Sequence, residues 1–585
     1  MRYLCLVVLG LVLFASGCGD RGEPAAIPGT LRFAATASLS QLDPHRARTV
    51  NDGRIIECLY EPLLRQRSDD LTIDPGVAER WDVSDDGLTW TFHLREDAKW
   101  SDGQPVTADD FRFAFRRMLL PDTSGYYASL FFAIKGAQEF YNWRQSQLTE
   151  FAKGSQEDPQ SLYREALRRF DERVGVEAPD ARTLVVHLTN PVPYLEGLLA
   201  FSPFSPLPQH VLEPQTQADP TTGRASIDSA YFGDPAKLVT NGPYVLKQWL
   251  LRDSATLEAN PFYWDRKSMQ NERVIQYEVS DPIVAVMKYD RGELDWLPDV
   301  PTGSRLASQL VNSKRTDVAS MPASATYYYE FNVQPVVHGR KNPLADARVR
   351  RALSMAIDRQ TIVDRVTRMH QPVARTLVPV GAMPGYDPPV EAGVSYDIAE
   401  ARRLLAEAGY PGGQGLDGLT IMINNGGGHE LPAQFIKRTW EKELGVRVGI
   451  EALEWSMHNQ RRDQGDFWIA RAGWFADYQD PMTFLELFEG GNSSNQSGYA
   501  NPQYDALIEQ SRHEPDPAKR LAILRRAEAI LVHDQPLAPI YQYTNLHLFR
   551  PDQVKHLNPN PPNARRLEWV EVTNGEEEIA TDEHG

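Results

Sequence analysis

Cysteine is scarce in this sequence. The 585 residues include 3 cysteines, Cys5, Cys18 and Cys58, and the first two fall within the opening 18 positions. A disulfide or a cysteine-based metal site requires at least two thiols, so the single cysteine beyond position 18 excludes both within one chain. We therefore expect a fold without a disulfide framework.

Signatures of enzymes are also missing. The sequence contains no Gly-x-Ser-x-Gly elbow, no His-Glu-x-x-His pair, no P-loop and no dinucleotide fingerprint. The glycine-rich run Asn424–Glu430 follows a strand expected at Leu419–Ile423 and precedes an expected helix, but it lacks the Lys and Ser/Thr of a P-loop. A flexible turn is favoured there over a phosphate cradle. The 13 histidines show no paired ligand spacing, so we expect no catalysis, no metal and no cofactor.

A basic stripe of the kind that binds phosphates is absent. Asp and Glu number 79 against 61 Lys and Arg, which gives a net charge of −18. This balance argues against nucleic acid as a partner. The hydrophobic share of 42% and the charged share of 24% are those of an ordinary globular protein. At this length we expect two to four domains, and we expect a monomer.

Long hydrophobic runs are absent beyond the first residues. The apolar run Tyr3–Phe14 is too short to span a membrane and ends in small residues, as secretory signal peptides do. Ala15-Ser16-Gly17-Cys18 resembles a bacterial lipobox, with Ala15 at the usual Leu position. We expect a signal peptide over 1–17, lipid on Cys18 and a tether over 18–29. The alternative is a soluble secreted protein with a free cysteine.

Local patterns predict several elements. Apolar and polar residues alternate over Leu88–Leu94, after an Asp86-Gly87 turn, which predicts a hairpin strand. Thr107 is expected to cap a helix that carries acidic residues in its first turn. We also expect a strand and a turn over Thr30–Pro44 and a helix over Ile55–Leu64.

The stretch Phe467–Leu485 has the composition of a small-molecule site. A strand is expected at Phe467–Ile469, and Trp474, Phe475 and Tyr478 then surround the single carboxylate of Asp477. A carboxylate between apolar walls attracts a cation strongly. Arg471 adds a group of the opposite sign, so the pair suits a zwitterion. Alternatively, Asp477 caps the turn that follows a core strand, with Arg471 as its ion-pair partner.

Several motifs together resemble one protein family. The run Trp81–Phe111 resembles the signature of the periplasmic solute-binding proteins of the dipeptide/oligopeptide/nickel ABC-importer family, family 5. Further matching pieces occur in the family's order, at Thr240–Leu246, Asn260–Trp264, Gly292–Asp295 and Asp346–Arg359. The resemblance covers about Thr30 to Val572. Within the family, Phe467–Leu485 resembles the oligopeptide-binding branch in particular.

The resemblance implies an α/β fold of the periplasmic-binding-protein type II kind, with two lobes joined by a hinge and an extra third domain. The implied divisions are lobe I at 30–44, 178–273 and 545–572, the extra domain at 45–177, and lobe II at 274–544. The polar stretch Asn142–Arg173 is longer than the family pattern and predicts an inserted helical excursion. The acidic residues 573–585 predict a disordered tail.

The resemblance also assigns roles to individual residues. Asp477 falls where the family pairs an Asp with the α-ammonium group of a peptide, and Arg471 and Arg462 fall where arginines reach its C-terminal carboxylate. Trp455 would line a side-chain pocket and share a helix face with Arg462, or else lie in an ordinary core. The remaining candidates are Trp474, Tyr127 and Asn241; for Asn241 a turn-setting role before the Tyr244 strand is favoured over ligand contact.

The implied function is that of a lipid-anchored substrate-binding protein on the periplasmic or extracellular face. It would capture oligopeptides between closing lobes and deliver them to ABC transporter permease subunits, behind which stand cytoplasmic ATPases. The peptide would be held by its main chain as an added strand, with its side chains in hydrated pockets. Two alternatives remain: a receptor for an oligosaccharide, metal chelate or cell-wall fragment, and a surface protein that has lost transport.

Overall fold

The computed structural model describes residues 27–36, 38–47, 49–154, 157–301, 303–492, 494–563 and 565–573. The predicted signal peptide, Cys18, the tether as far as residue 26 and the acidic tail from residue 574 lie outside the described residues. Among the helices that are described, none is both long enough and apolar enough to cross a bilayer.

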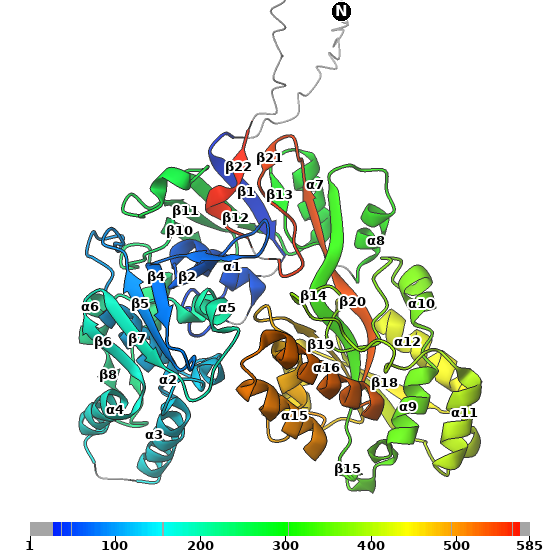
Figure 1. Ribbon diagram of the computed structural model, residues 1–585. Helices are drawn as coiled ribbons and strands as arrows, with labels where there is room; N and C mark the ends of the chain where they lie inside the picture. The colour runs from blue at the N-terminus through cyan, green and yellow to red at the C-terminus, as the bar shows by residue number, and fades with distance from the viewer. Residues whose placement is uncertain are drawn as a thin grey trace, which may run out of the picture.

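One ten-stranded sheet runs through the molecule (Figure 1). In spatial order its strands are β10 (Tyr244–Leu250), β11 (Ser254–Ala259), β12 (Arg273–Glu278), β1 (Thr30–Ala35), β13 (Trp296–Leu297), β20 (Leu537–Phe549), β14 (Val318–Phe331), β19 (Ile469–Phe475), β17 (Leu419–Asn424) and β18 (Val448–Leu453). Strands β1 and β12 are parallel, as are β17, β18 and β19. The two longest strands, β14 and β20, are antiparallel and lie in the middle.

The long strands join two halves of the sheet. The last part of β20 pairs with β13 on one side and with the first part of β14 on the other, whereas Ala325–Phe331 of β14 pair with β19. Between these parts the register shifts, because four residues of β14, from Pro322 to Thr326, advance while β20 advances two, from Thr544 to Gln542. Figure 1 shows the two halves as separate bodies connected by these strands.

A smaller antiparallel sheet lies in the first body, with the order β4 (Ala78–Val83), β5 (Thr89–Leu94), β7 (Thr183–His187) and β6 (Val176–Asp180). The predicted alternating strand is confirmed as β5, whose residues Trp90, Phe92 and Leu94 are buried. The hairpin turn is confirmed as well, since β4 and β5 pair and Gly87 takes a left-handed φ of 71°.

The helix after Thr107 is confirmed as α2 (Ala108–Leu119). The Asp110 carboxylate accepts hydrogen bonds from the Thr107 backbone N–H and hydroxyl at 2.8 and 3.0 Å. The excursion predicted over Asn142–Arg173 is helical, as α3 (Ala137–Ala152) and α4 (Pro159–Arg173). These two helices form the lower end of the first body in Figure 1.

Two predicted boundaries were wrong. The helix expected at Ile55–Leu64 is α1 (Val50–Leu59), because Thr49 caps it by accepting from Asp52 N–H at 3.0 Å and the chain is extended from Tyr60. The strand expected at Phe467–Ile469 is β19, which begins at Ile469 and continues through Gly473. The strand at Leu419–Ile423 is confirmed as β17.

The second body has helices on both faces of the sheet. Tyr327, Tyr329 and Phe331 of β14 pack into one core, whereas Tyr328 points to the other side, toward Phe488.

The remaining helices of the whole molecule are α5 (Leu195–Leu199), α6 (Gln209–Leu212), α7 (Pro282–Asp290), α8 (Arg305–Val311), α9 (Ala347–Met355), α10 (Arg359–Thr361), α11 (Ile398–Glu407), α12 (Glu430–Thr439), α13 (Trp455–Asp463), α14 (Met482–Leu485), α15 (Pro502–His513) and α16 (Pro517–Asp534). Short pairs are β2 (Leu64–Gln66) with β3 (Ile73–Pro75), β8 (Gln217–Ala218) with β9 (Ala225–Ser226), β15 (Val336–Val337) with β16 (Arg340–Lys341), and β21 (Val554–Lys555) with β22 (Glu571–Val572). The architecture is α/β, as predicted.

The two bodies touch where the site candidates lie. The rings of Tyr194 and Tyr478 are stacked at 4.7 Å with an interplanar angle of 12°, and the Arg520 guanidinium lies 5.3 Å from the Tyr194 ring. Tyr194 belongs to the predicted lobe I and Tyr478 to the predicted lobe II. The residue limits of those lobes stay a prediction.

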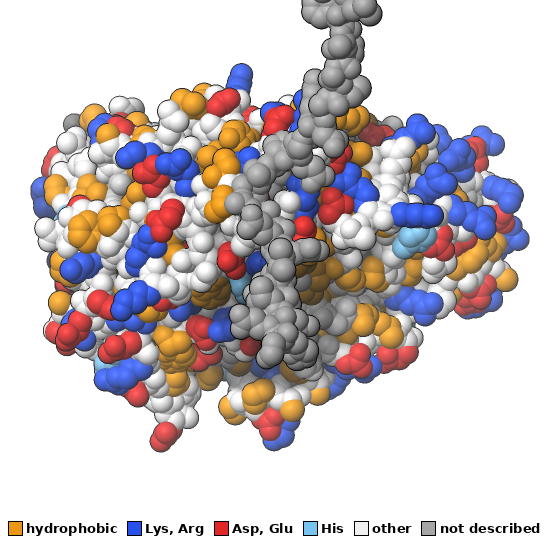
Figure 2. Space-filling view, turned by 90° about the horizontal axis from the view of Figure 1, so that it is seen from above, with side chains coloured by type: hydrophobic (Ala, Val, Ile, Leu, Met, Phe, Trp, Pro, Cys, Tyr) orange, Lys and Arg blue, Asp and Glu red, His pale blue; other side chains and the backbone are white. Residues whose placement is uncertain are grey.

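Figure 2 views the molecule from above and shows acidic and basic side chains interspersed over the described part of that face. Charges of both signs share this surface with apolar patches, so the net charge of −18 is not concentrated on it.

Candidate functional site

Asp477 follows β19 at the junction of the two bodies. Its backbone N–H donates to the Thr483 hydroxyl at 3.1 Å, and the Tyr127 hydroxyl is 3.5 Å from its Oδ1 atom. None of the described ion pairs includes this carboxylate. Burial raises the pKa of Asp477 to about 7, with only the Tyr127 hydrogen bond opposing it. Asp477 is therefore a desolvated acid without a counter-ion among the described residues.

The alternative in which Asp477 caps a turn and pairs with Arg471 is wrong. The turn is capped by Asp480, whose carboxylate accepts from the Met482 N–H at 2.9 Å. Arg471 bonds to other groups, described next. The two charges are thus held apart in the protein, as a site for a zwitterion requires.

Arg471 lies in β19 opposite Tyr329 of β14. Its guanidinium donates to Asn424 Oδ1 at 3.2 Å and to the Tyr543 hydroxyl, and it lies 5.1 Å from the centre of the Tyr327 ring. Its Nε–H is buried without a hydrogen-bond partner, and none of the described ion pairs includes Arg471. A buried guanidinium that has no carboxylate partner within the protein can bind the carboxylate of a ligand.

Two histidines that sequence reasoning set aside lie in the field of Arg471. Burial first, and the Arg471 charge second, lower the pKa of His429 to about 3. Burial also lowers the pKa of His458 to about 4, and Arg471 contributes. Both imidazoles are therefore neutral at pH 7, so the positive charge of this region comes from Arg471 and, beside His458, from Arg462. His429 belongs to the glycine-rich run and lies directly before α12. No sequence motif around it indicated that it would lie near the candidate site.

Arg462 differs from Arg471 in having a counter-ion. It lies in α13, and its Nε atom is 2.7 Å from the Glu330 carboxylate, whose side chain is 1% exposed. Glu330 belongs to β14, so the pair ties α13 to the sheet. A peptide carboxylate at Arg462 would have to share the guanidinium with Glu330.

The aromatic candidates line the same region. Trp455 opens α13, as expected, and the residue is 54% exposed, so the ordinary-core alternative is wrong. Its ring stacks on His458 with centroids 6.2 Å apart. Trp474 is half-buried in β19 with its indole N–H lacking a partner. Tyr127 packs edge-on against Phe201 at 5.1 Å.

Asn241 is buried, and both polar atoms of its side chain form hydrogen bonds within the protein. Its Oδ1 atom accepts from the Glu61 backbone N–H at 3.1 Å and its Nδ2 atom donates to the Glu61 carbonyl at 2.8 Å. These bonds hold the loop of Asn241 against the segment that follows α1, which favours a structural role for Asn241. Ligand contact by Asn241 stays a prediction.

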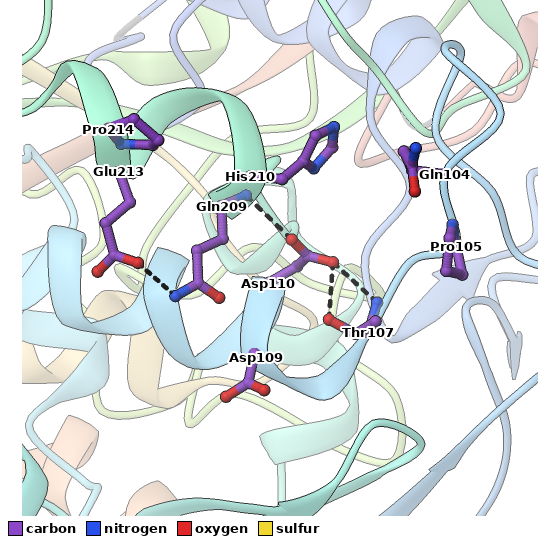
Figure 3. Close-up of a pocket in the computed structure, with 9 residues that line it drawn as sticks. All are labelled: Gln104, Pro105, Thr107, Asp109, Asp110, Gln209, His210, Glu213 and Pro214. Atoms are coloured by element: carbon purple, nitrogen blue, oxygen red, sulfur yellow. Dashed lines mark hydrogen bonds between the residues drawn. The ribbon is translucent and has the colours of Figure 1, made fainter.

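A separate open pocket lies on the first body, near the start of α2 (Figure 3). Its polar groups largely bond to one another: Asp110 accepts from Thr107 and from the Gln209 N–H at 3.0 Å, and Gln209 donates to Glu213 at 2.6 Å. The described residues also contain no cluster of three or more His, Cys, Asp or Glu able to hold a metal ion. The region of Asp477 and Arg471, whose charges have no partner among the described residues, is therefore a better candidate for the ligand site than this pocket.

Comparison with known proteins identifies the family of the chain. The sequence model described as "Bacterial extracellular solute-binding proteins, family 5 Middle" matches residues 72–496. The periplasmic oligopeptide-binding protein OppA of Escherichia coli (strain K12) is 32% identical over 574 residues, which cover 93% of this chain and 94% of OppA. The "Probable deoxycholate-binding periplasmic protein YgiS" of the same organism is 30% identical over 94% of this chain and 95% of its own.

Solved structures show the same fold, which confirms the predicted type II periplasmic-binding-protein architecture. The Haemophilus influenzae OppA complex with the peptide RPPGFSPFR matches with a TM-score of 0.73 and 29% identity, over 94% of this chain and 99% of that chain. The matched family consists of substrate-binding proteins rather than enzymes. The chain belongs to the bacterial extracellular solute-binding proteins of family 5, in the oligopeptide-binding branch.

Proposed function

We propose that this protein is a lipid-anchored, monomeric substrate-binding protein of an ABC importer. It captures oligopeptides between its two lobes and delivers them to the membrane permease. The observation that carries the proposal is the pair of buried, unpaired charges, a carboxylate at Asp477 and a guanidinium at Arg471, on one stretch of chain. A peptide carries an α-ammonium group and a C-terminal carboxylate, which are the partners that Asp477 and Arg471 lack.

The energetics favour a charged N-terminus as the ligand of Asp477. The carboxylate is already desolvated, so an α-ammonium that reaches it completes an ion pair instead of leaving a buried charge alone. Removing one member of such a pair costs about 3–5 kcal/mol, which is about two to three decades in affinity or more.

The positions of the two charges along β14 support an extended peptide. The Ala476 N–H, next to Asp477, donates to the Ser324 carbonyl at 2.8 Å, and Arg471 pairs with Tyr329 five residues further on. The Arg471 guanidinium reaches back over the Tyr327 ring, three residues from Ser324. At about 3.3 Å per residue the two charges are therefore roughly 10 Å apart, the reach of an extended peptide of about three residues. Main-chain binding of this kind accepts many sequences.

A second candidate ligand is a non-peptide solute with a carboxylate. The similarity to a relative named for deoxycholate favours it specifically. Such an acid would use Arg471 and the aromatic walls at Trp455 and Trp474, and it would leave Asp477 without a partner. The role of Asp477 therefore separates the two functions.

The test is calorimetric titration of residues 19–585 with tripeptides to pentapeptides, each supplied with a free and with an N-acetylated amine. We expect binding of the free peptides, a loss of at least 100-fold on acetylation, and a similar loss in Asp477→Ala. Equal binding of acetylated and free peptides would overturn capture through the ammonium group. No binding by folded wild type would favour the non-peptide solute.

The lipid anchor rests on the motif Ala15–Cys18 alone. We expect that Cys18→Ser moves the protein from the membrane fraction to the soluble fraction of cells, while wild type stays with the membrane. Unchanged fractionation would contradict lipid attachment at this residue.

A further inference from the structure

A group of aromatic and cationic contacts joins the two bodies beside the candidate site. Tyr194, which directly precedes α5 of the first body, stacks on Tyr478 of the second body with ring centroids 4.7 Å apart. The Arg520 guanidinium of α16 lies 5.3 Å from the centre of the same Tyr194 ring. We refer to Tyr194, Tyr478 and Arg520 as the clasp. Tyr478 is the residue after Asp477, so the clasp adjoins the candidate site.

The second-body side of the clasp is fixed by its own polar bonds. Arg520 donates two hydrogen bonds to Asp480, at 2.6 and 2.9 Å, and its side chain is 2% exposed. The buried Tyr478 donates its hydroxyl to Glu486 at 3.0 Å. Both groups are therefore held in place without Tyr194, and they present a flat ring and a cation to it. A stacked aromatic pair and a cation over an aromatic face are both attractive.

The first-body side of the clasp is stiffened by proline. Tyr194 follows the run Pro191–Pro193, in which the first and last residues are proline. Proline fixes the backbone φ angle, which reduces the conformational freedom of the segment. Glu196, in the first turn of α5, also accepts from the Trp81 indole N–H of β4 at 3.0 Å. The Tyr194 ring is therefore carried by a segment that moves with the first body.

Contacts between the bodies stabilise the closed arrangement, in which the bodies touch. Tyr194 and Tyr478 belong to different bodies, so their stack is lost when the bodies separate. The affinity of a ligand that binds between the bodies rises with the population of the closed arrangement. Removing the clasp lowers this population, and the ligand then dissociates faster. This effect does not require Tyr194 to contact the ligand.

We propose that Tyr194 is the closing contact between the two lobes, and that its packing on Tyr478 and beside Arg520 holds the lobes closed around a bound peptide. This proposal rests on the proposed function. The peptide ammonium group pairs with Asp477, and the clasp next to it slows the release of the peptide. Tyr194 acts on ligand affinity through the position of the lobes and not through a bond to the ligand.

The experiment compares wild type, Tyr194→Ala and Tyr194→Phe by calorimetry and by stopped-flow dissociation of a free-amine tetrapeptide. We expect Tyr194→Ala to bind about tenfold more weakly, through faster dissociation, because the stack and the cation–π contact are lost. Tyr194→Phe keeps the ring and should remain within about threefold of wild type. The matched control is Tyr396→Ala, an exposed tyrosine of the second body, which should change neither quantity.

The pH profile separates closure of the lobes from a direct action on Asp477. If Tyr194 acts through closure, Tyr194→Ala should be weaker by the same factor at pH 7 and at pH 5. A loss that disappears at pH 5, where Asp477 is protonated, would show that Tyr194 acts on the charge of Asp477. That result would overturn the proposal.

Distances between the bodies supply a readout that does not depend on affinity. Spin labels are attached at Glu79→Cys in the first body and Glu441→Cys in the second, both exposed positions, in residues 19–585, whose native Cys58 is buried. We expect Tyr194→Ala to reduce the short-distance population with and without peptide. Equal distributions in wild type and Tyr194→Ala would overturn the closing contact. A wild type that binds no peptide would contradict the proposed function, and the distances without peptide would still test the closing contact.

Discussion

Two aspartates three residues apart lie in opposite environments. The Asp480 carboxylate forms a two-bond ion pair with Arg520 at 2.6 and 2.9 Å, and it also accepts from the N–H of Met482, the first residue of α14. The Asp477 carboxylate has a single 3.5 Å contact, with Tyr127. Both belong to the same short connection after β19. The difference shows that the first acid is used by the fold, whereas the second is left for a ligand.

The largest expected effect is on stability, at Asp480. Asp480→Ala should lower the free energy of unfolding by about 3–5 kcal/mol, because it leaves the Arg520 guanidinium buried and unpaired. Urea denaturation followed by circular dichroism measures this. Asp477→Ala is the matched control and should not destabilise the protein. Equal losses from the two variants would remove the distinction between them.

The pH dependence of peptide affinity is expected next. Asp477 has a pKa of about 7 in the free protein, so its charged form is depleted about tenfold for each pH unit below 7. The charged fraction falls from about one half at pH 7 to about one hundredth at pH 5, so affinity for a free-amine peptide should fall about 50-fold between these pH values. Titration across this range measures it, with Asp477→Asn as the control expected to give a flat profile. A flat wild-type profile would contradict the role of Asp477.

Stability should depend on pH in the opposite direction. The pKa of Asp477 is higher in the folded than in the unfolded state, so its contribution to stability is present below about pH 4 and is lost as the pH rises through 7. Asp477→Asn should therefore stabilise the unliganded protein by about 4 kcal/mol at pH 8 and by little at pH 4. Denaturation at both pH values measures this. A variant less stable than wild type at pH 8 would show that the carboxylate supports the fold.

The smallest effect is expected at Tyr127. Its hydroxyl lies 3.5 Å from Asp477, which is at the limit of a hydrogen bond. Tyr127→Phe should change peptide affinity by less than about threefold, because a weak contact is lost. Calorimetry measures this beside Tyr194→Phe, whose ring stacks on Tyr478. A loss of tenfold or more in Tyr127→Phe would indicate that this hydroxyl contacts the ligand.

Much of the local structure could be predicted from the sequence. The alternation in β5, the Thr107 cap of α2 and the helix that holds Trp455 and Arg462 follow local rules. The extent of β19 does not, because Gly473 breaks the local strand pattern. In the structure Gly473 pairs with Tyr327, and a Cβ there would lie 2.8 Å from the Tyr543 hydroxyl, so close packing favours glycine.

The candidate site could be predicted only in part. Asp477 stands out because its aromatic neighbours are adjacent in sequence. The partners of the arginines are distant: Glu330 lies 132 residues from Arg462, and Tyr543 lies 72 residues from Arg471. Local patterns carry no information on such pairs, so sequence reasoning could not distinguish the neutralised arginine from the unpaired one.

The shift between Pro322 and Thr326 has a mechanical consequence. β14 and β20 pass continuously between the two halves of the sheet, so a change in the angle between the halves must bend this pair of strands. Pro322 lacks an N–H group, and the ladder is interrupted from there to Thr326, which makes this the most compliant part of the pair. The angle between the two halves in the unliganded protein therefore depends on the backbone conformation of a few residues of β14, from Pro322 to Thr326.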